Sequence, residues 1–211
     1  FFLFSHLMNA QIVINEYSAA NCDNDGGGCG NYEDWIEIYN NSANSIDLNG
    51  YHVSDRLSNI MKWQFTGSLV LDPGEHTIIY AAGLDPDLQV SNNTTSFKLT
   101  QTKATEYVVI SSPEGTILDY KKITKHQLNH SVGRTTDGAS DWSVFTDPTI
   151  EQANTNSTSF SGYKQSPYFN YEPGFYAEDL SVSILCDDVD VEIYYTLDGS
   201  FPDETGIYYG Y

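Results

Sequence analysis

The stretch NYEDWIEIYNNS, residues 31–42, decides the fold class of this sequence. Within it the segment DWIEIYN, residues 34–40, alternates in character with a period of two. This alternation predicts a β-strand, because successive side chains of a strand point to opposite faces. One face would carry Ile36 and Ile38, and the other would carry Trp35, Glu37 and Tyr39.

Further short segments of this kind occur on both sides of residues 34–40. They are QIVINEYS (11–18), LNGYHVSD (48–55), MKWQF (61–65), HTIIYA (76–81) and EYVVI (106–110). The last is joined to GTILDY (115–120) by the sequence Ser112-Pro113-Glu114-Gly115, which is typical of a hairpin turn. Helical periodicity is nearly absent, and regular short strands separated by turns predict an all-β, immunoglobulin-like sandwich.

The chain divides by composition into one large and one small module. We predict a β-sandwich over residues 11–154, a small and polar linker over 155–166, and a second module over 167–211. The second module has ten acidic residues and neither Lys nor Arg. Its strands are too few to close a sandwich, so we expect a partial β-sandwich-like module.

Charge and hydropathy limit the partners of the chain. Acidic residues outnumber basic ones 29 to 9, for a formal charge of −20, which disfavours nucleic-acid binding. No apolar run is long enough to cross a membrane. Residues 1–10 resemble the end of a secretory signal peptide cleaved after Ala10, which predicts a secreted or surface protein. Four basic residues form either an anion-binding patch or a solvated loop: Lys121, Lys122, Lys125 and Arg134.

The loop NCDNDGGGCG, residues 21–30, precedes the strand that decides the fold. In an exported protein Cys22 and Cys29 could form a disulfide that closes this loop. Cys186 is expected to be a small buried apolar residue. Hard oxygen ligands also gather here, and they predict a candidate calcium site formed by Asp23, Asn24, Asp25 and Asp34. A disulfide-closed, solvated loop without metal is the alternative.

Catalytic motifs are absent from the sequence. Glu16, Glu37 or Asp55 could contribute to an acid–base pair of carboxyl groups. Alternatively, Glu16 and Glu37 could hydrogen-bond buried backbone or pair with a cation such as Arg56. His126 and His130 are four residues apart, but their surroundings are typical of a loop and not of a helical metal site. We therefore expect no catalytic residue in this chain.

Several separated motifs, in order, resemble a bacterial lamin-tail domain. They include IVINEY, DWIEIYNNS, IDLNGYHVSD, LDPGEHTIIYA and YVVISSPEGTILD. The segment from Ser166, and above all IYYTLDGSFPD (193–203), is similar to the chitobiase/β-hexosaminidase C-terminal-like, fibronectin-III-associated module. The resemblance implies sandwich folds and an accessory role without established catalytic residues.

The order of the two modules resembles the N-terminal part of secreted CotH-type proteins, which carry a kinase-like domain further along. The resemblance implies an adhesion or positioning module of a bacterial surface protein, with protein or glycan partners and downstream domains in the same polypeptide. Two alternatives stay open: a part of a metal-dependent enzyme, and a calcium-stabilised structural spacer.

Overall fold

The computed structural model describes residues 11–22, 32–84, 93–200, 202–203 and 205–210. The chain forms two compact units, Phe1–Ser161 and Gly162–Tyr211. Apart from the 3-10 turn η2 (Asn154–Asn156), the described residues form strands and loops. This confirms the predicted all-β fold class.

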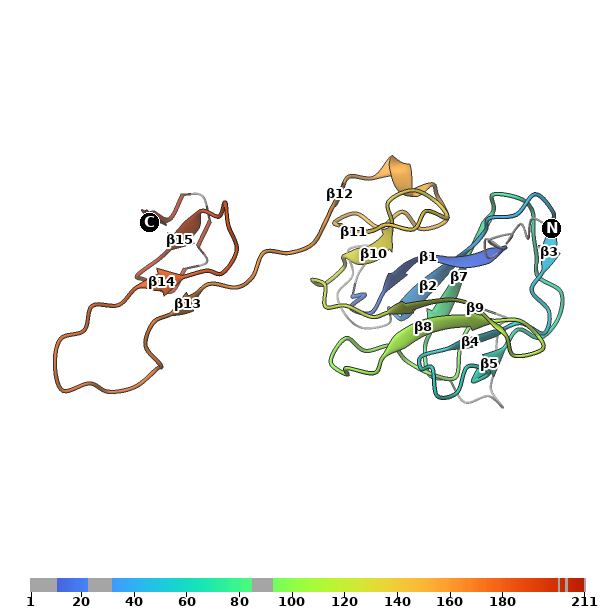
Figure 1. Ribbon diagram of the computed structural model, residues 1–211, viewed down its shortest axis with the longest axis horizontal. Coiled ribbons are helices and arrows are strands. Elements are labelled where there is room, and N and C mark those ends of the chain that lie inside the picture. The colour runs from blue at the N-terminus through green and yellow to red at the C-terminus, as the bar shows by residue number, and fades with distance from the viewer. Residues whose placement is uncertain (1–10, 23–31, 85–92, 201, 204, 211) are drawn as a thin grey trace, which may run out of the picture. The chain divides into compact units, whose positions relative to one another are not determined.

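The first unit is a sandwich of two antiparallel sheets (Figure 1). The larger sheet has the order β12-β11-β10-β1-β2-β7, and the smaller one has the order β5-β4-β8-β9. The larger sheet consists of β1 (Ile12–Ser18), β2 (Asp34–Asn40), β7 (His76–Ala81), β10 (Ser131–Arg134), β11 (Trp142–Phe145) and β12 (Ser159–Phe160). The smaller sheet consists of β4 (His52–Ser54), β5 (Trp63–Gln64), β8 (Tyr107–Ser111) and β9 (Ile117–Lys122). A short ribbon pairs β3 (Ile46–Asp47) with β6 (Val70–Leu71).

The predicted alternation of β2 is confirmed by its pairing. Ile36 and Ile38 lie opposite Tyr17 and Ile14 of β1, and all four side chains are fully buried. Val108 and Ile110 of β8, in the other sheet, are also fully buried. Burial of such aliphatic side chains stabilises the fold by about 1.5–3 kcal/mol each. The hairpin turn at Ser112–Gly115 is also confirmed, since Gly115 donates its N–H to Ser112 O at 2.9 Å with a φ of 79°.

Strand β1 contains a β-bulge that its sequence pattern did not reveal. Ile14 pairs with Ile38 but Glu16 pairs with Glu37, so Asn15 is an extra residue without a partner of its own in the ladder. A bulge changes the alternation of side chains along the strand. As a result Asn15 and Glu16 are both fully buried and both take part in the polar cluster around Glu37.

A buried ion pair connects the two sheets. Arg134 of β10 is only 8% exposed, and its Nη2 donates to Asp119 Oδ2 of β9 at 2.7 Å. The same Asp119 oxygen accepts the N–H of Ile14 at 2.9 Å, while Arg134 Nε donates to Ile14 O at 2.7 Å. Asp119 and Arg134 thereby satisfy the backbone of β1 next to its bulge.

The basic patch predicted from the sequence is therefore divided by the fold. Arg134 forms the ion pair with Asp119 and therefore does not belong to an exposed basic patch. Lys121 lies in strand β9, with Nζ 4.4 Å from the centre of the Trp142 ring. Burial and the nearby Arg134 lower the pKa of Lys121. The solvated-loop interpretation holds for Lys125 but is wrong for Arg134, because a long-range contact with β9 buries it.

Replacement of Asp119 by alanine is expected to lower the free energy of unfolding by about 2 kcal/mol. The variant D119A leaves the Ile14 N–H and Nη2 of the buried Arg134 without their acceptor. Thermal unfolding followed by tryptophan fluorescence reports on this unit, because all three Trp residues lie in it. The exposed Asp147 supplies the control, and a D147A variant that destabilises as much as D119A would contradict the role of Asp119.

The second unit contains two short ribbons. One pairs β13 (Tyr168–Phe169) with β14 (Ile184–Leu185), and the other pairs β15 (Ile193–Tyr195) with β16 (Ile207–Tyr209). Among its described residues only Ile193 is a buried apolar side chain. Cys186 is half-buried, so its predicted burial is wrong; Ile184 and Leu185 before it are half-buried too, because this unit has only short ribbons to cover them.

Candidate functional site

The acidic residues at the start of β2 form hydrogen bonds with Asn21. Asp34 Oδ1 accepts the N–H of Asn21 at 3.1 Å, and Asn21 Nδ2 donates to Glu33 O at 2.9 Å. Burial raises the pKa of Asp34 to about 6, and the neighbouring Glu33 adds to the effect against the hydrogen bond from Asn21. Asp34 thus has a structural role, as the acceptor of the Asn21 N–H.

The predicted calcium site remains a prediction. Asp23, Asn24 and Asp25 lie outside the described residues, and so does Cys29. Cys22 is buried, is disulfide-bonded, and donates its backbone N–H to Asn129 Oδ1 at 2.7 Å. The described part of the chain holds no group of three or more His, Cys, Asp or Glu side chains that could bind a metal ion.

The most concentrated polar cluster is centred on Glu16. Its carboxyl group accepts hydrogen bonds from the Ser131 hydroxyl, the Thr149 hydroxyl and the Thr149 N–H. The opposing residue on β10 is Gly133, where a Cβ atom would come within 3.0 Å of the Glu16 side chain. The sequence therefore places glycine where the carboxylate needs space.

Glu37 lies directly opposite Glu16 on the neighbouring strand. Its Oε1 accepts a hydrogen bond from Asn15 Nδ2 at 3.0 Å, and its Oε2 accepts the N–H of Glu151 at 2.7 Å. Asn154 is 1% exposed, and its Oδ1 accepts a further hydrogen bond from Asn15 Nδ2 at 3.1 Å. The segment from Thr149 to Asn154 thus covers both carboxyl groups and binds to them through its backbone.

The carboxyl groups of Glu16 and Glu37 do not readily carry a negative charge at the same time. Burial raises the pKa of Glu37 to about 8, and the facing Glu16 adds to this against the hydrogen bond from Asn15. Burial also raises the pKa of Glu16, while its bonds from Ser131 and Thr149 oppose the rise. The larger number of donors at Glu16 favours the ionised form there, with the proton held by Glu37.

The geometry makes this pair structural. Glu16 and Glu37 are both 0% exposed, and their oxygens are occupied by donors of the same chain. A general acid or base must come within hydrogen-bond reach of its substrate, about 2.6–3.2 Å. Of the alternatives left open by the sequence, hydrogen bonding to buried backbone is the one found for both residues. Arg56 is bound to Asp55 and not to either of them.

His126 also has a structural role. Its Nε2 accepts the N–H of Ala19 at 3.0 Å, and its Nδ1 lies 3.0 Å from Thr124 O. Burial lowers the pKa of His126, so the neutral ring that can accept from Ala19 is favoured. This arrangement agrees with the predicted loop and gives no helical metal pair.

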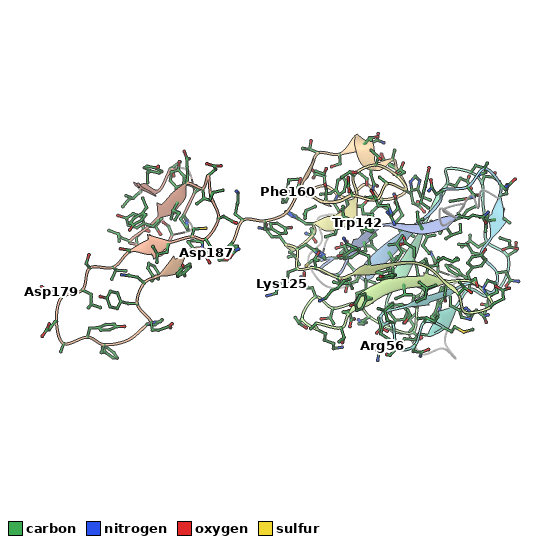
Figure 2. The ribbon with its side chains drawn as sticks, in the orientation of Figure 1. Arg56, Lys125, Trp142, Phe160, Asp179 and Asp187 are labelled. Atoms are coloured by element: carbon green, nitrogen blue, oxygen red, sulfur yellow. The ribbon has the colours of Figure 1, made fainter. Side chains whose placement is uncertain are left out.

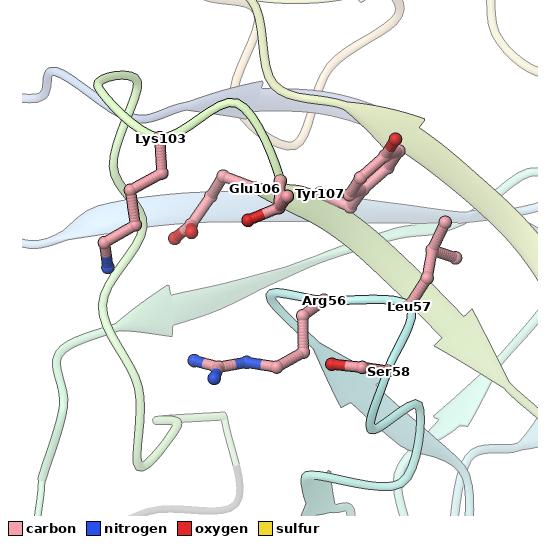
Figure 3. Close-up of a pocket in the computed structure, with 7 residues that line it drawn as sticks. Arg56, Leu57, Ser58, Lys103, Glu106 and Tyr107 are labelled. Atoms are coloured by element: carbon pink, nitrogen blue, oxygen red, sulfur yellow. The ribbon is translucent and has the colours of Figure 1, made fainter.

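A charged pocket lies beside the smaller sheet, on the turn after β4 and the segment that leads into β8 (Figure 3). Arg56 holds the buried Asp55 through two bonds, Nε–Oδ1 at 2.8 Å and Nη2–Oδ2 at 2.7 Å. Lys62 Nζ donates to the same Oδ2 at 2.7 Å. Burial opposes ionisation of Asp55, but these hydrogen bonds outweigh it and lower the pKa.

Glu106 is the residue of this pocket that sequence reasoning missed. It is 4% exposed, and its Oε1 is buried without a hydrogen-bond partner among the described residues. Burial and the nearby Asp55 raise its pKa, against the attraction of Lys103 and Arg56. The available signal was an acidic residue directly before the apolar run YVVI, as at Glu33 and Asp34 before the run of β2.

Comparison with known families assigns the larger unit. The sequence profile of the lamin tail domain matches residues 8–157, more than half of the 211-residue chain. The chain belongs to the lamin tail domain family. A second profile, that of the chitobiase/beta-hexosaminidase C-terminal domain, matches residues 171–210. No curated protein matches the chain.

These matches confirm the two family resemblances drawn from the sequence. The lamin tail domain contains the Glu16–Glu37 cluster and the pocket at Glu106. Both matched families are non-catalytic, immunoglobulin-like β-modules. In the described residues we find no helix with the length and apolar character needed to cross a membrane.

Proposed function

We propose that this chain is a non-catalytic accessory part of a secreted or surface-located bacterial protein, where it positions or attaches the protein through a protein or glycan partner. The observation that carries the proposal is the enclosure of Glu16 and Glu37. The facing pair of carboxyl groups that would suit acid–base catalysis is fully buried and occupied by internal donors.

Export is supported by the chemistry of Cys22. A disulfide-bonded cysteine is typical of proteins that fold in an oxidising compartment. The predicted signal-peptide residues 1–10 and the predicted partner Cys29 lie outside the described residues. We infer a secreted or cell-surface location, and we propose the CotH-type arrangement as the context of the two modules, with any kinase-like activity carried by another domain.

The charge of the chain favours some partners over others. At −20 it repels polyanions over distances up to about a Debye length, roughly 8 Å at physiological ionic strength. Neutral glycans and proteins with a cationic surface suit it better. Calcium bound at Asp23, Asn24, Asp25 and Asp34 would stabilise such a module without changing this role.

Sedimentation with insoluble chitin, cellulose and isolated bacterial cell envelopes tests the proposal. We expect saturable retention of the folded chain on at least one of these materials, and loss of retention after the chain is thermally unfolded. Protease treatment of the envelopes then separates protein from glycan partners. Equal, non-saturable retention of folded and unfolded chain on all materials would contradict an adhesion role.

A further inference from the structure

A pocket of the size of a ligand site lies beside Glu106. Its volume is about 490 Å³, within the range of about 300–1,000 Å³ that is usual for ligand pockets. It is lined by Arg56, Leu57, Ser58, Lys103, Thr105, Glu106 and Tyr107. Neither Arg134 nor Asp119 lines this pocket, and in Figure 2 Arg56 and Trp142 lie apart from one another.

Glu106 brings an unused hydrogen-bond acceptor to this pocket. A buried polar group without a partner costs about 1–3 kcal/mol, so its retention calls for an explanation. In Figure 3 the Glu106 side chain extends into the space between those of Lys103 and Arg56. A ligand that donates a hydrogen bond to Oε1 would satisfy the acceptor left unpaired in the described residues.

The surrounding cations supply donors. Arg56 uses Nε and Nη2 to bind Asp55, which leaves Nη1 out of this pair, and its side chain is 46% exposed. Lys103 is exposed on the opposite wall. The Ser58 and Thr105 hydroxyls add groups that both donate and accept.

These charges argue against an ionic ligand. An anion would meet the Glu106 carboxyl group and the −20 charge of the chain. A cation would meet Arg56 and Lys103, both of which line the pocket and act electrostatically on Glu106. A neutral ligand rich in both donors and acceptors avoids both penalties.

The apolar part of the wall is small. It consists of Leu57, which is 40% exposed, and the ring of the half-buried Tyr107. Protein partners bind mainly through large, desolvated aromatic or aliphatic anchors, for which this pocket offers no deep apolar floor. The C–H face of a sugar ring, with hydroxyl groups around its edge, fits such a surface better.

We propose that the Glu106 pocket binds a neutral saccharide unit, with Glu106 Oε1 accepting a sugar hydroxyl and Arg56 and Lys103 donating to sugar oxygens. This proposal rests on the adhesion role above and names its partner class. The lamin tail domain would then contact a neutral glycan through the loops beside β4 and β8.

Titration calorimetry of the full chain with soluble neutral oligosaccharides of glucose, mannose, xylose and N-acetylglucosamine tests the proposal. We expect one of them to bind with one site per chain, and E106Q to weaken that binding about tenfold, because an amide replaces a charge-assisted acceptor. The variant K103A removes a donor on an exposed side chain and is expected to weaken binding by about threefold. E114Q and K125A, which change the same charges on exposed positions elsewhere, are expected to bind as the wild type does.

The outcomes separate this proposal from the adhesion role. If an oligosaccharide binds and E106Q binds it as tightly as the wild type, the pocket assignment is wrong while the adhesion role stands. Failure of every oligosaccharide to bind, with protease-sensitive retention on envelopes, would overturn the saccharide proposal in favour of a protein partner. E106Q loses no described hydrogen bond, so its fold should be retained, and its unfolding midpoint checks this.

Discussion

Replacement of Glu16 by alanine is expected to lower the free energy of unfolding of the lamin tail domain by about 3–5 kcal/mol. The variant E16A removes the acceptor of the Ser131 hydroxyl and of the N–H and hydroxyl of Thr149. It also leaves a cavity beside Gly133, where the Glu16 side chain now packs. At roughly 2–4 °C per kcal/mol, the midpoint should fall by about 10 °C.

Two further variants define the origin of this loss. E16Q keeps one acceptor oxygen and the side-chain volume, so we expect it to lose about half as much as E16A. The matched control is E75A, since Glu75 is exposed and is expected to cost less than about 1 kcal/mol. A fall for E16A no larger than that for E75A would contradict the structural role of Glu16.

Stability is expected to fall as the pH rises from about 4.5 to about 8. Glu37 has a folded-state pKa near 8 against an ordinary value of 4.5, so within this window the folded state binds a proton that the unfolded state does not. The stabilisation is fully present below the unfolded pKa and is lost as the pH passes through the folded one. A shift of this size corresponds to a loss on the order of 3–5 kcal/mol.

The variant E37Q tests the assignment of this pH dependence. It mimics the protonated acid, so the decline in stability between pH 5 and pH 8.5 should shrink to about half or less. Asp34, with its pKa raised to about 6, supplies part of the remainder. Chemical denaturation at several pH values measures the slope, with E114Q as the control for loss of one exposed acid. A slope for E37Q equal to that of the wild type would assign the pH dependence to other groups.

Much of the fold followed from local pattern. The strand DWIEIYN, the faces of its side chains and the hairpin at Ser112–Gly115 are confirmed, because period and turn chemistry act over a few residues. The bulge at Asn15 was not predictable, since it depends on the register with β2 and not on β1 alone.

The polar sites were harder to predict because they join distant segments. Glu16 and Glu37 were identified from the sequence, but all of their donors except Asn15 come from Ser131, Thr149 and Glu151, more than a hundred residues further along. The only sequence signal at Glu106 was its place directly before the apolar run YVVI, and its burial beside Arg56 and Lys103 became evident only in the structure.

The most direct test of a binding role without catalysis is a product analysis of bound ligand. The chain is incubated with the oligosaccharide that it binds, with and without millimolar calcium, and the mixture is separated by chromatography. We predict that the saccharide is recovered unchanged at saturation, in wild type, E16Q and E37Q alike. Formation of a new product by the wild type that E16Q or E37Q abolishes while still folded would contradict the account and make the carboxyl pair catalytic.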